Sequence, residues 1–242
     1  MTAVGRPGPV IRLEGVTKVF GGSGHSTTAV RDVSFEARPG EMVLFLGPSG
    51  SGKTTLLTLI AGLAKPTSGR VALFGRSVDE YSAAELQSLR ADKIGFIFQT
   101  FLLIEALTAR ENIEIVLRFC GKRRAERARR TRALLGELGI EYLADRFPRA
   151  MSQGEKQRVA IGRAIANDAE LLIADEPTGS LETQQALGII GLLHAQARTR
   201  NTTVVVASHD LRLQDYADRT LHLQDGEIRQ AVSQGPGEGS RP

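Results

Sequence analysis

The chain has 242 residues, 41% of them hydrophobic, which is enough for one large domain or for a domain with a smaller subdomain. No apolar run approaches the roughly 20 residues that cross a bilayer, and Met1–Pro9 lacks the apolar core of a signal peptide. The net charge is only +4, and the single Cys120 excludes an internal disulfide, so we expect a cytoplasmic protein.

Strands are predicted where short apolar runs lie between turn residues. In chain order they are Val10–Leu13 paired with Val16–Phe20, Val30–Ala37, Glu41–Leu46, Gly69–Gly75, Ile94–Phe98, Leu171–Ala174, Thr203–Ala207 and Leu221–Leu223, which the turn Asp225-Gly226 follows. A small-residue loop is predicted at Gly21–Ser26. The runs at Leu171–Ala174 and Thr203–Ala207 are almost wholly apolar, as expected of parallel strands that helices cover on both faces.

Helices are predicted at Thr54–Ala61, Ser82–Arg90, Ala109–Phe119 and Arg124–Leu138. Gly62 is placed to end the first of them, and Ser82 with Glu85 forms the sequence pattern of a capping box. Strand signals are absent from 100 to about 162, so we expect an inserted helical subdomain within a core of 10–99 and 163–230. The tails at 1–9 and 231–242 are rich in Gly, Ser and Pro, and we expect them to be flexible.

The motif between the predicted strand 41–46 and the first predicted helix identifies a phosphate-binding loop. Its residues fit G-x-x-x-x-G-K-S/T and are Gly47, Pro48, Ser49, Gly50, Ser51, Gly52, Lys53, Thr54 and Thr55. The glycines allow successive N–H groups to turn toward one anion, and the helix N-terminus adds partial positive charge. We expect Lys53 to reach the terminal phosphates and the Thr54 hydroxyl to hold Mg²⁺.

Further polar side chains follow the predicted parallel strands, at the edge where open α/β sheets bind ligands. Asp175 follows 171–174 and is placed to hold Mg²⁺, and Glu176 comes next as a candidate general base. His209 follows the strand 203–207 and Gln99 follows 94–98, so both can reach a phosphate, a metal or the attacking water. Phe20 ends an early strand and is a candidate for stacking on a base, or a core residue.

A second candidate phosphate site lies at 152–160. Ser152 and Glu155 fit a capping box, and Ser152, Gln153 and Gly154 place a hydroxyl and a glycine N–H at a helix N-terminus. One nucleotide does not require two such sites in one chain. The residues therefore fit either a plain capped helix or a site for a partner subunit's nucleotide.

These motifs together resemble the nucleotide-binding domain of ATP-binding cassette (ABC) transporters. The resemblance covers about 10–229 and rests on GPSGSGKTT at 47–55, Gln99, SQGEK at 152–156, LLIADEPTGSLE at 171–182 and SHD at 208–210. It implies an α/β fold with a phosphate-loop NTPase (RecA-like) core, an N-terminal antiparallel β subdomain and an inserted α-helical subdomain. It also implies a head-to-tail dimer that holds two Mg-ATP, each between one phosphate loop and the partner's Ser152-Gln153-Gly154-Glu155 signature.

The resemblance implies a role for each site residue. Phe20 stacks on adenine; Thr54, Gln99 and Asp175 hold Mg²⁺; Glu176 is the catalytic base, with His209 and Gln99 as further catalytic groups. Two residues depart from the family pattern. Gln153 replaces the first glycine of the usual Ser-Gly-Gly, and Glu182 stands where the family has Asp in the loop that crosses the dimer interface. We expect both departures to affect the rate of ATP hydrolysis, because neither removes a phosphate or metal ligand.

Within the family, 85–90, 94–99 and 107–113 look like the lipoprotein-releasing, macrolide-exporting and cell-division ATPases. That branch implies a separate permease with a large extracytoplasmic domain, docked near Gln99–Ile104, and a peripheral position on the inner face of the membrane. The expected activity is ATP hydrolysis that drives export or extraction of lipoprotein, lipid, peptide or drug. The alternatives are a regulatory ATPase that signals through a permease to a cell-wall enzyme, a soluble ATPase acting on nucleic acid, and a nucleotide switch without turnover.

The segment Lys122–Arg132 holds seven basic residues and one acid, Glu126, so its charge of +6 leaves −2 for the rest of the chain. A solvated helix face explains such a run, and contact with anionic lipid or nucleic acid also fits it. No aromatic residue lies within the run, which disfavours binding of single-stranded nucleic acid. We expect no specific nucleic-acid partner.

Overall fold

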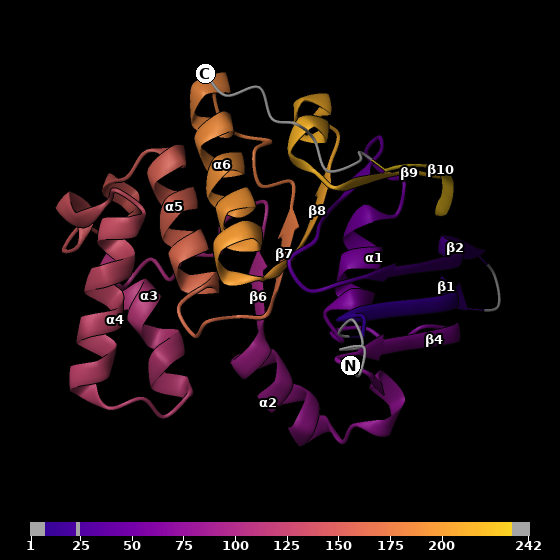
Figure 1. Ribbon diagram of the computed structural model, residues 1–242, viewed down its shortest axis with the longest axis horizontal. Helices are drawn as coiled ribbons and strands as arrows, with labels where there is room; N and C mark the ends of the chain where they lie inside the picture. Colours follow the sequence, from indigo (N-terminus) through magenta and orange to yellow (C-terminus); the bar gives the residue numbers. More distant parts are fainter. Residues whose placement is uncertain (1–7, 23–24, 234–242) are drawn as a thin grey trace, which may run out of the picture.

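The computed structural model describes residues 8–22 and 25–233, which form two sheets with helices packed around them (Figure 1). The larger sheet has six strands in the order β10-β9-β3-β8-β7-β6. Its strands are β3 (Met42–Leu46), β6 (Ile94–Ile97), β7 (Leu171–Asp175), β8 (Thr203–Ser208), β9 (Arg219–Gln224) and β10 (Glu227–Ser233). All pairs are parallel except β9 with β10, which the predicted Asp225-Gly226 turn joins.

The central strands of this sheet are buried on both faces, as their apolar sequences predict. Side chains alternate between the faces, so Met42 and Leu44 of β3 belong to one hydrophobic cluster and Val43 and Phe45 to another. The first cluster lies against the helices α3 to α6, and the second against α1 and the smaller sheet. The carboxyl ends of β3, β7 and β8 meet at one edge of the sheet.

The smaller sheet is antiparallel, in the order β2-β1-β4-β5. Its strands are β1 (Ile11–Gly22), β2 (His25–Ala37), β4 (Ser68–Leu73) and β5 (Arg76–Ser77). The predicted pairing of 10–13 with 16–20 is wrong, because these residues form the single strand β1. Its register shifts at Gly15, whose φ is +57°, and this irregularity lets both Leu13 and Val16 face the core.

The predicted loop at Gly21–Ser26 is also largely replaced by strand. Gly21 and Gly22 belong to β1, and His25 and Ser26 belong to β2. Residues 23–24 of this loop lie outside the described residues.

Four helices begin and end close to their predicted bounds, namely α1 (Lys53–Ile60), α2 (Ala83–Lys93), α3 (Ala109–Phe119) and α4 (Arg124–Glu137). The helix α5 (Gln153–Ala164) follows the predicted capping box at Ser152, and α6 (Thr183–Arg200) was not predicted. The capping box of Ser82 and Glu85 is confirmed, and Gly62 adopts a φ of +62° after α1. Short 3-10 turns lie at Val78–Glu80, Glu141–Leu143, Pro148–Ala150 and Leu211–Tyr216.

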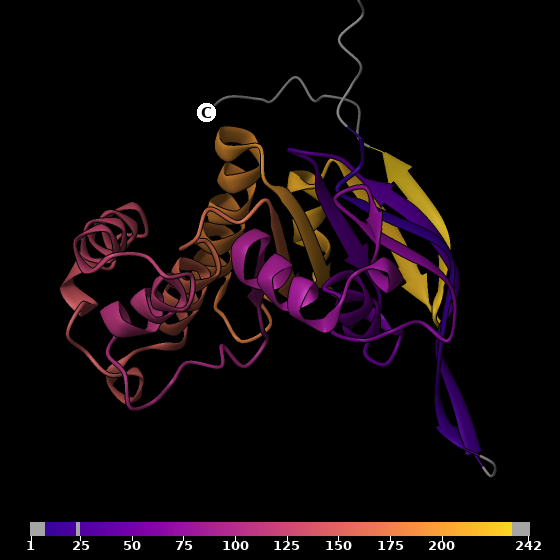
Figure 2. The same ribbon diagram turned by 90° about the horizontal axis from the view of Figure 1, so that it is seen from below.

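Figures 1 and 2 show α3, α4 and α5 grouped at one end of the molecule, with β1, β2 and β4 at the other. Among the described residues between β6 and β7 there is no strand, in agreement with the expected helical insertion. The subdomain bounds stay a prediction, and α5 runs past 162 to Ala164. No helix in the described part of the chain is long and apolar enough to span a membrane.

The predicted flexible tails fall mostly outside the described residues, at 1–7 and 234–242. At the carboxyl end the predicted tail began at 231, but β10 continues to Ser233.

Candidate phosphate-binding site

The phosphate loop joins β3 to α1, as its motif predicts. Its start is fixed by a hydrogen bond from the Gly47 N–H to the Ser208 carbonyl (3.1 Å), and its middle by one from Gly226 N–H to the Ser51 carbonyl (3.0 Å). Gly52 is the N-cap of α1 with a φ of 98°, and no side chain caps the helix there. The first N–H groups of α1 are therefore available to an anion.

Lys53 is buried in the loop, with only 6% of its surface exposed. Its Nζ donates to the carbonyls of Gly47 (2.7 Å) and Pro48 (2.9 Å) and forms an ion pair with Glu176 Oε1 (3.3 Å). The ammonium thus lies inside the curve of the loop and bridges it to the end of β7. This arrangement holds a cation next to the free N–H groups of α1.

Asp175 ends β7 and lies beneath the loop. Its Oδ2 accepts a hydrogen bond from the Thr54 hydroxyl (2.8 Å), whereas its buried Oδ1 has no partner among the described residues. Burial raises the pKa of Asp175 above its usual value, opposed by the Thr54 hydrogen bond. An oxygen that is buried without a partner is costly, so Oδ1 fits a site completed by a bound ligand.

Glu176 adopts a left-handed backbone with a φ of 46°, which is uncommon for a residue with a side chain. Its N–H donates to the Ala207 carbonyl (2.8 Å), which ties this conformation to β8. Its Oε2 accepts from the Ser208 hydroxyl (3.2 Å) and lies 3.0 Å from His209 Nδ1. Strained backbone of this kind is concentrated at functional sites.

These groups surround a cleft of about 350 Å³. It is lined by Ala29, Ser49, Gly50, Gly52, Lys53, Thr54, Thr55, Gln99, Glu176 and His209. The structure therefore brings together the phosphate loop, the two acids, Gln99 and His209 from four separate segments, as the sequence analysis expected. Gln99 and His209 are exposed, so both can meet a ligand that enters from solvent.

The predicted signature and Phe20 do not line this cleft. Ser152 and Gln153 are exposed at the start of α5, and the capping box of Ser152 with Glu155 is confirmed. Tyr142 adds a hydrogen bond to Glu155 (2.9 Å), which the sequence analysis missed. Phe20 lies on β1 with 49% of its surface exposed, so it is not a core residue.

Sequence reasoning also missed the contributions of Ser208 and Ala29. Ser208 touches both the loop and Glu176, and its position directly before His209 was the available signal. The Ala29 carbonyl lies where a side chain on Gly52 would need to be. This contact joins β2 to the phosphate loop. Because the two residues are far apart in the sequence, no local pattern predicts it.

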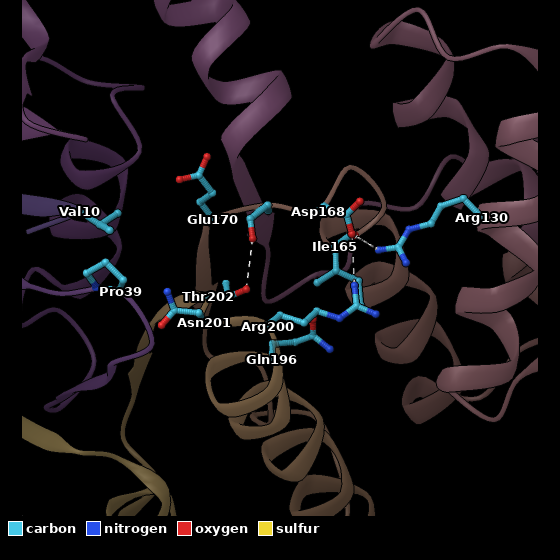
Figure 3. Close-up of a pocket in the computed structure, with 11 residues that line it drawn as sticks. Val10, Pro39, Arg130, Ile165, Asp168, Glu170, Gln196, Arg200, Asn201 and Thr202 are labelled. Carbon is cyan, nitrogen blue, oxygen red and sulfur yellow. Dashed lines mark hydrogen bonds and ion pairs between the residues drawn. The ribbon is translucent and has the colours of Figure 1, made fainter. Parts of the chain in front are cut away.

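A second cavity, of about 470 Å³, lies away from the phosphate loop (Figure 3). Arg130 of α4 and Arg200 of α6 both pair with Asp168, at 2.6 and 3.4 Å, and Arg200 also pairs with Glu137 at 2.6 Å. The positive charges of the two arginines are therefore neutralised by the two carboxylates of Asp168 and Glu137. We interpret this cluster as a link between α4 and the end of α6 rather than as a ligand site.

The fold and the cleft define a mononucleotide-binding protein of the phosphate-loop class. The family model described as ABC transporter matches residues 30–179, and the chain belongs to this family. The putative hemin import ATP-binding protein HrtA of Staphylococcus haemolyticus is 40% identical over 90% of this chain and 98% of its own length. The macrolide export ATP-binding/permease protein MacB of Agrobacterium fabrum is 35% identical over 91% of this chain, which spans 34% of that protein.

Solved structures agree with this assignment. The ATP-binding cassette MJ0796, in a dimeric post-hydrolysis state bound to ADP and Pi, superimposes with a TM-score of 0.85. It is 37% identical, over 92% of this chain and 98% of that one. The cassette cbiO1 of Clostridium perfringens, part of the transporter complex cbiONQ, has a TM-score of 0.83 and 26% identity, over 93% and 88% of the two chains. The chain is an ATP-binding ATPase of the ABC transporter family.

Proposed function

We propose that the chain is the motor subunit of a membrane transporter, in which ATP hydrolysis in the phosphate-loop cleft drives a separate permease. The observation that carries this proposal is the group of contacts around Glu176. Lys53, Ser208 and His209 all touch its carboxylate beside the free N–H groups of α1. A carboxylate held next to a phosphate site fits a group that accepts a proton from an attacking water.

Lys53 and Glu176 have separate tasks once a nucleotide enters. The Lys53 ammonium faces the loop, so it is placed to exchange its Glu176 contact for the terminal phosphates. Glu176 Oε1 is then free to accept a proton from water, while the Ser208 hydroxyl continues to hold Oε2. The His209 side chain is 60% exposed, so it can exchange its contact with Glu176 for a contact with the phosphate.

The donor set also fits a magnesium ion. Asp175, Thr54 and Gln99 offer carboxylate, hydroxyl and amide oxygens, which are the hard ligands that Mg²⁺ prefers. The unpartnered Asp175 Oδ1, directly beneath Thr54, is the structural feature that supports this assignment. When bound, Mg²⁺ neutralises charge on the phosphates.

We propose that two copies of the chain dimerise head to tail. Ser152 and Gln153 are exposed and lie outside the cleft, as expected of a site that serves the partner's nucleotide. The glutamine at 153 is solvent-exposed rather than packed inside, so it has room to turn away from that nucleotide. The MJ0796 cassette is dimeric in its solved structures, which supports the proposal by analogy.

We propose that the permease docks beside Gln99–Ile104. Leu102 and Ile104 are apolar but 53% and 44% exposed, and Arg163 holds the carbonyls of Phe101 and Leu102 from α5. A neighbouring groove of about 860 Å³ runs between α2, β6, α3 and α5, and Arg163 lines it too. Docking of the permease beside Gln99–Ile104 would place the chain in the cytoplasm, peripherally on the inner face of the membrane.

The substrate is the least constrained part of the proposal. The named relatives are described as a putative hemin import protein and a macrolide export protein, so their names do not agree on cargo or direction. We favour export or extraction of lipoprotein, lipid, peptide or drug, because of the resemblance at 85–90, 94–99 and 107–113. The second candidate is regulation of a cell-wall enzyme through a permease, and a transport assay with the reconstituted permease separates the two.

The decisive variant is Glu176→Gln, with Glu170→Gln as its matched control. The two glutamates flank β7, and the control makes the same chemical change at the far end of that strand. We expect Glu176→Gln to retain ATP binding, to form an ATP-dependent dimer in size-exclusion chromatography and to lose at least about 100-fold in turnover. Turnover at the wild-type rate would refute the assignment of Glu176.

The trapped variant also tests the transporter function. Tagged Glu176→Gln protein is purified with ATP from its native membranes, and the bound proteins are identified by mass spectrometry. A permease with a large extracytoplasmic domain supports the proposal. Nucleic acid or ribosomes without a membrane protein would overturn it.

A further inference from the structure

The connection between α3 and α4 carries an exposed aromatic residue and several basic ones. We define the α3–α4 tip as Arg118, Phe119, Lys122, Arg123 and Arg124, which follow one another at the end of α3 and the start of α4. Figures 1 and 2 place this helix pair at the outer end of the molecule. None of these residues belongs to the phosphate-loop cleft.

The basic run divides into residues with and without partners. Arg127 and Arg130 pair with Glu114 and Asp168, with only about a fifth of each arginine side chain exposed (21% and 22%), so they contribute to folding. Lys122 pairs with Glu126 at 3.2 Å. Within the described part of the chain, the exposed Arg118, Arg123 and Arg124 form no ion pair, and neither do the exposed Arg129 and Arg132 farther along α4. The tip therefore presents three uncompensated positive charges to solvent.

Helix energetics does not explain this placement. Arg123 is the N-cap of α4 and Arg124 its first residue, and no side chain caps the helix. The N-terminus of a helix carries partial positive charge and favours acids and Ser, Thr, Asp or Asn caps. Two arginines there cost helix stability, which is expected when the residues serve contact with another molecule.

Phe119 completes the pattern. It is the most exposed of the large apolar side chains in the described residues, at 81%, and it lies beside Arg118. It also lines the groove that neighbours the proposed permease contact. An aromatic ring next to uncompensated basic residues matches the chemistry of a bilayer interface, with apolar acyl boundary and anionic headgroups.

We propose that the α3–α4 tip binds the surface of an anionic bilayer, with Phe119 entering the interface and Arg118, Arg123 and Arg124 meeting lipid phosphates. The proposal builds on the membrane position inferred above. Its effect is to add a lipid contact next to the permease contact, which fixes the orientation of the helical end of the molecule. Nucleic acid is the disfavoured occupant, since the tip has one aromatic residue and no row of them.

The test is sedimentation of the full chain with sucrose-loaded vesicles at millimolar accessible lipid. Vesicles of neutral phosphatidylcholine are compared with vesicles that contain phosphatidylglycerol, at low and high salt. We expect binding to the anionic vesicles alone, weakened by salt. The loss of each arginine should lower the partition coefficient of the protein onto the vesicles about fivefold, so Arg123→Glu/Arg124→Glu should lower it at least about 25-fold. Phe119→Ser should also lower it.

A matched control separates the tip from diffuse charge. Arg129→Glu/Arg132→Glu makes the same charge change on two other exposed arginines of α4. We expect this variant to lose much less binding than the tip variant, whereas equal losses would overturn the proposal. Because acids favour a helix N-terminus, the tip variant should fold at least as well as wild type.

Two other outcomes would also overturn the proposal. The first is no binding to anionic vesicles, and the second is tip-dependent binding to a random-sequence DNA duplex without vesicle binding. ATP hydrolysis by the free chain should be unchanged in the tip variant. A failed vesicle test with normal hydrolysis therefore rejects the tip alone and leaves the ATPase function intact.

Discussion

Replacing Gly52 with alanine would add a methyl group where the phosphate loop packs closely against β2. A Cβ built on Gly52 lies 2.1 Å from the Ala29 carbonyl oxygen, a distance that non-bonded carbon and oxygen atoms do not adopt. The φ of 98° adds strain, because side chains disfavour this backbone region. The neighbouring atom belongs to the backbone of β2, so it cannot move aside as a flexible side chain does.

Gly50 supplies the matched control. Its φ is +81°, but a Cβ there meets nothing within 4 Å. Gly50→Ala should therefore cost only the backbone strain of about 1–2 kcal/mol. Gly52→Ala should cost that amount plus an overpacking cost of about 2 kcal/mol. The second cost corresponds to an extra loss of about 4–8 °C in Tm for a chain of this size.

The assay is thermal and denaturant unfolding of both variants without nucleotide, followed by ATP titration in a calorimeter. We expect Gly52→Ala to unfold at the lower temperature and to lose ATP affinity, because the loop must move away from β2. Equal losses of Tm in the two variants would refute this reasoning, since the contact with Ala29 would then contribute nothing.

Three further outcomes follow from the same structure. Lys53→Ala should lower ATP affinity roughly 10–100-fold in calorimetry, because it removes a charged donor to phosphate; unchanged affinity contradicts the phosphate-loop role. Arg200→Gln should lower the free energy of unfolding by about 1 kcal/mol, since its ion pairs with Glu137 and Asp168 are partly exposed. Burial raises the pKa of Asp175, so the folded state binds its proton more tightly and stability falls as pH rises above the unfolded carboxyl pKa. Asp175→Asn should remove this component from the pH dependence of unfolding, and an unaltered profile would contradict it.

The sequence predicted the elements whose signals are local. The capping boxes at Ser82 and Ser152 are confirmed. They were predictable because a serine and a glutamate three residues apart accept hydrogen bonds from the backbone N–H groups of the helix end, whatever surrounds the helix. The buried strands β7 and β8 were also predictable, since parallel strands with two covered faces need unbroken apolar runs. The polar residues that follow them meet at one edge because the strands are parallel.

Most failures arose where distant segments decide the local structure. The sequence analysis divided β1 into two paired strands, 10–13 and 16–20, but pairing with β2 and β4 on both sides keeps the strand continuous. Helix α6 carries a local signal that the sequence analysis missed. Its buried apolar residues recur at helical spacing, and further leucines outside this stripe weaken the pattern. The Lys53–Glu176 contact, in contrast, depends on how β7 lies against the loop.

We propose that this contact sets the order of events at the site. Without nucleotide, the Lys53 ammonium compensates the Glu176 carboxylate at 3.3 Å, so neither group is left as an isolated buried charge. A phosphate that enters the loop competes for Lys53 and releases Glu176 Oε1, while Ser208 keeps the carboxylate in place through Oε2. The hydrogen bond from the Glu176 N–H to the Ala207 carbonyl of β8 holds the backbone at its φ of 46°, so the residue stays in place. Binding of the phosphate therefore frees the proposed base at the position where it is needed, and the same contacts protect the fold when the cleft holds no nucleotide.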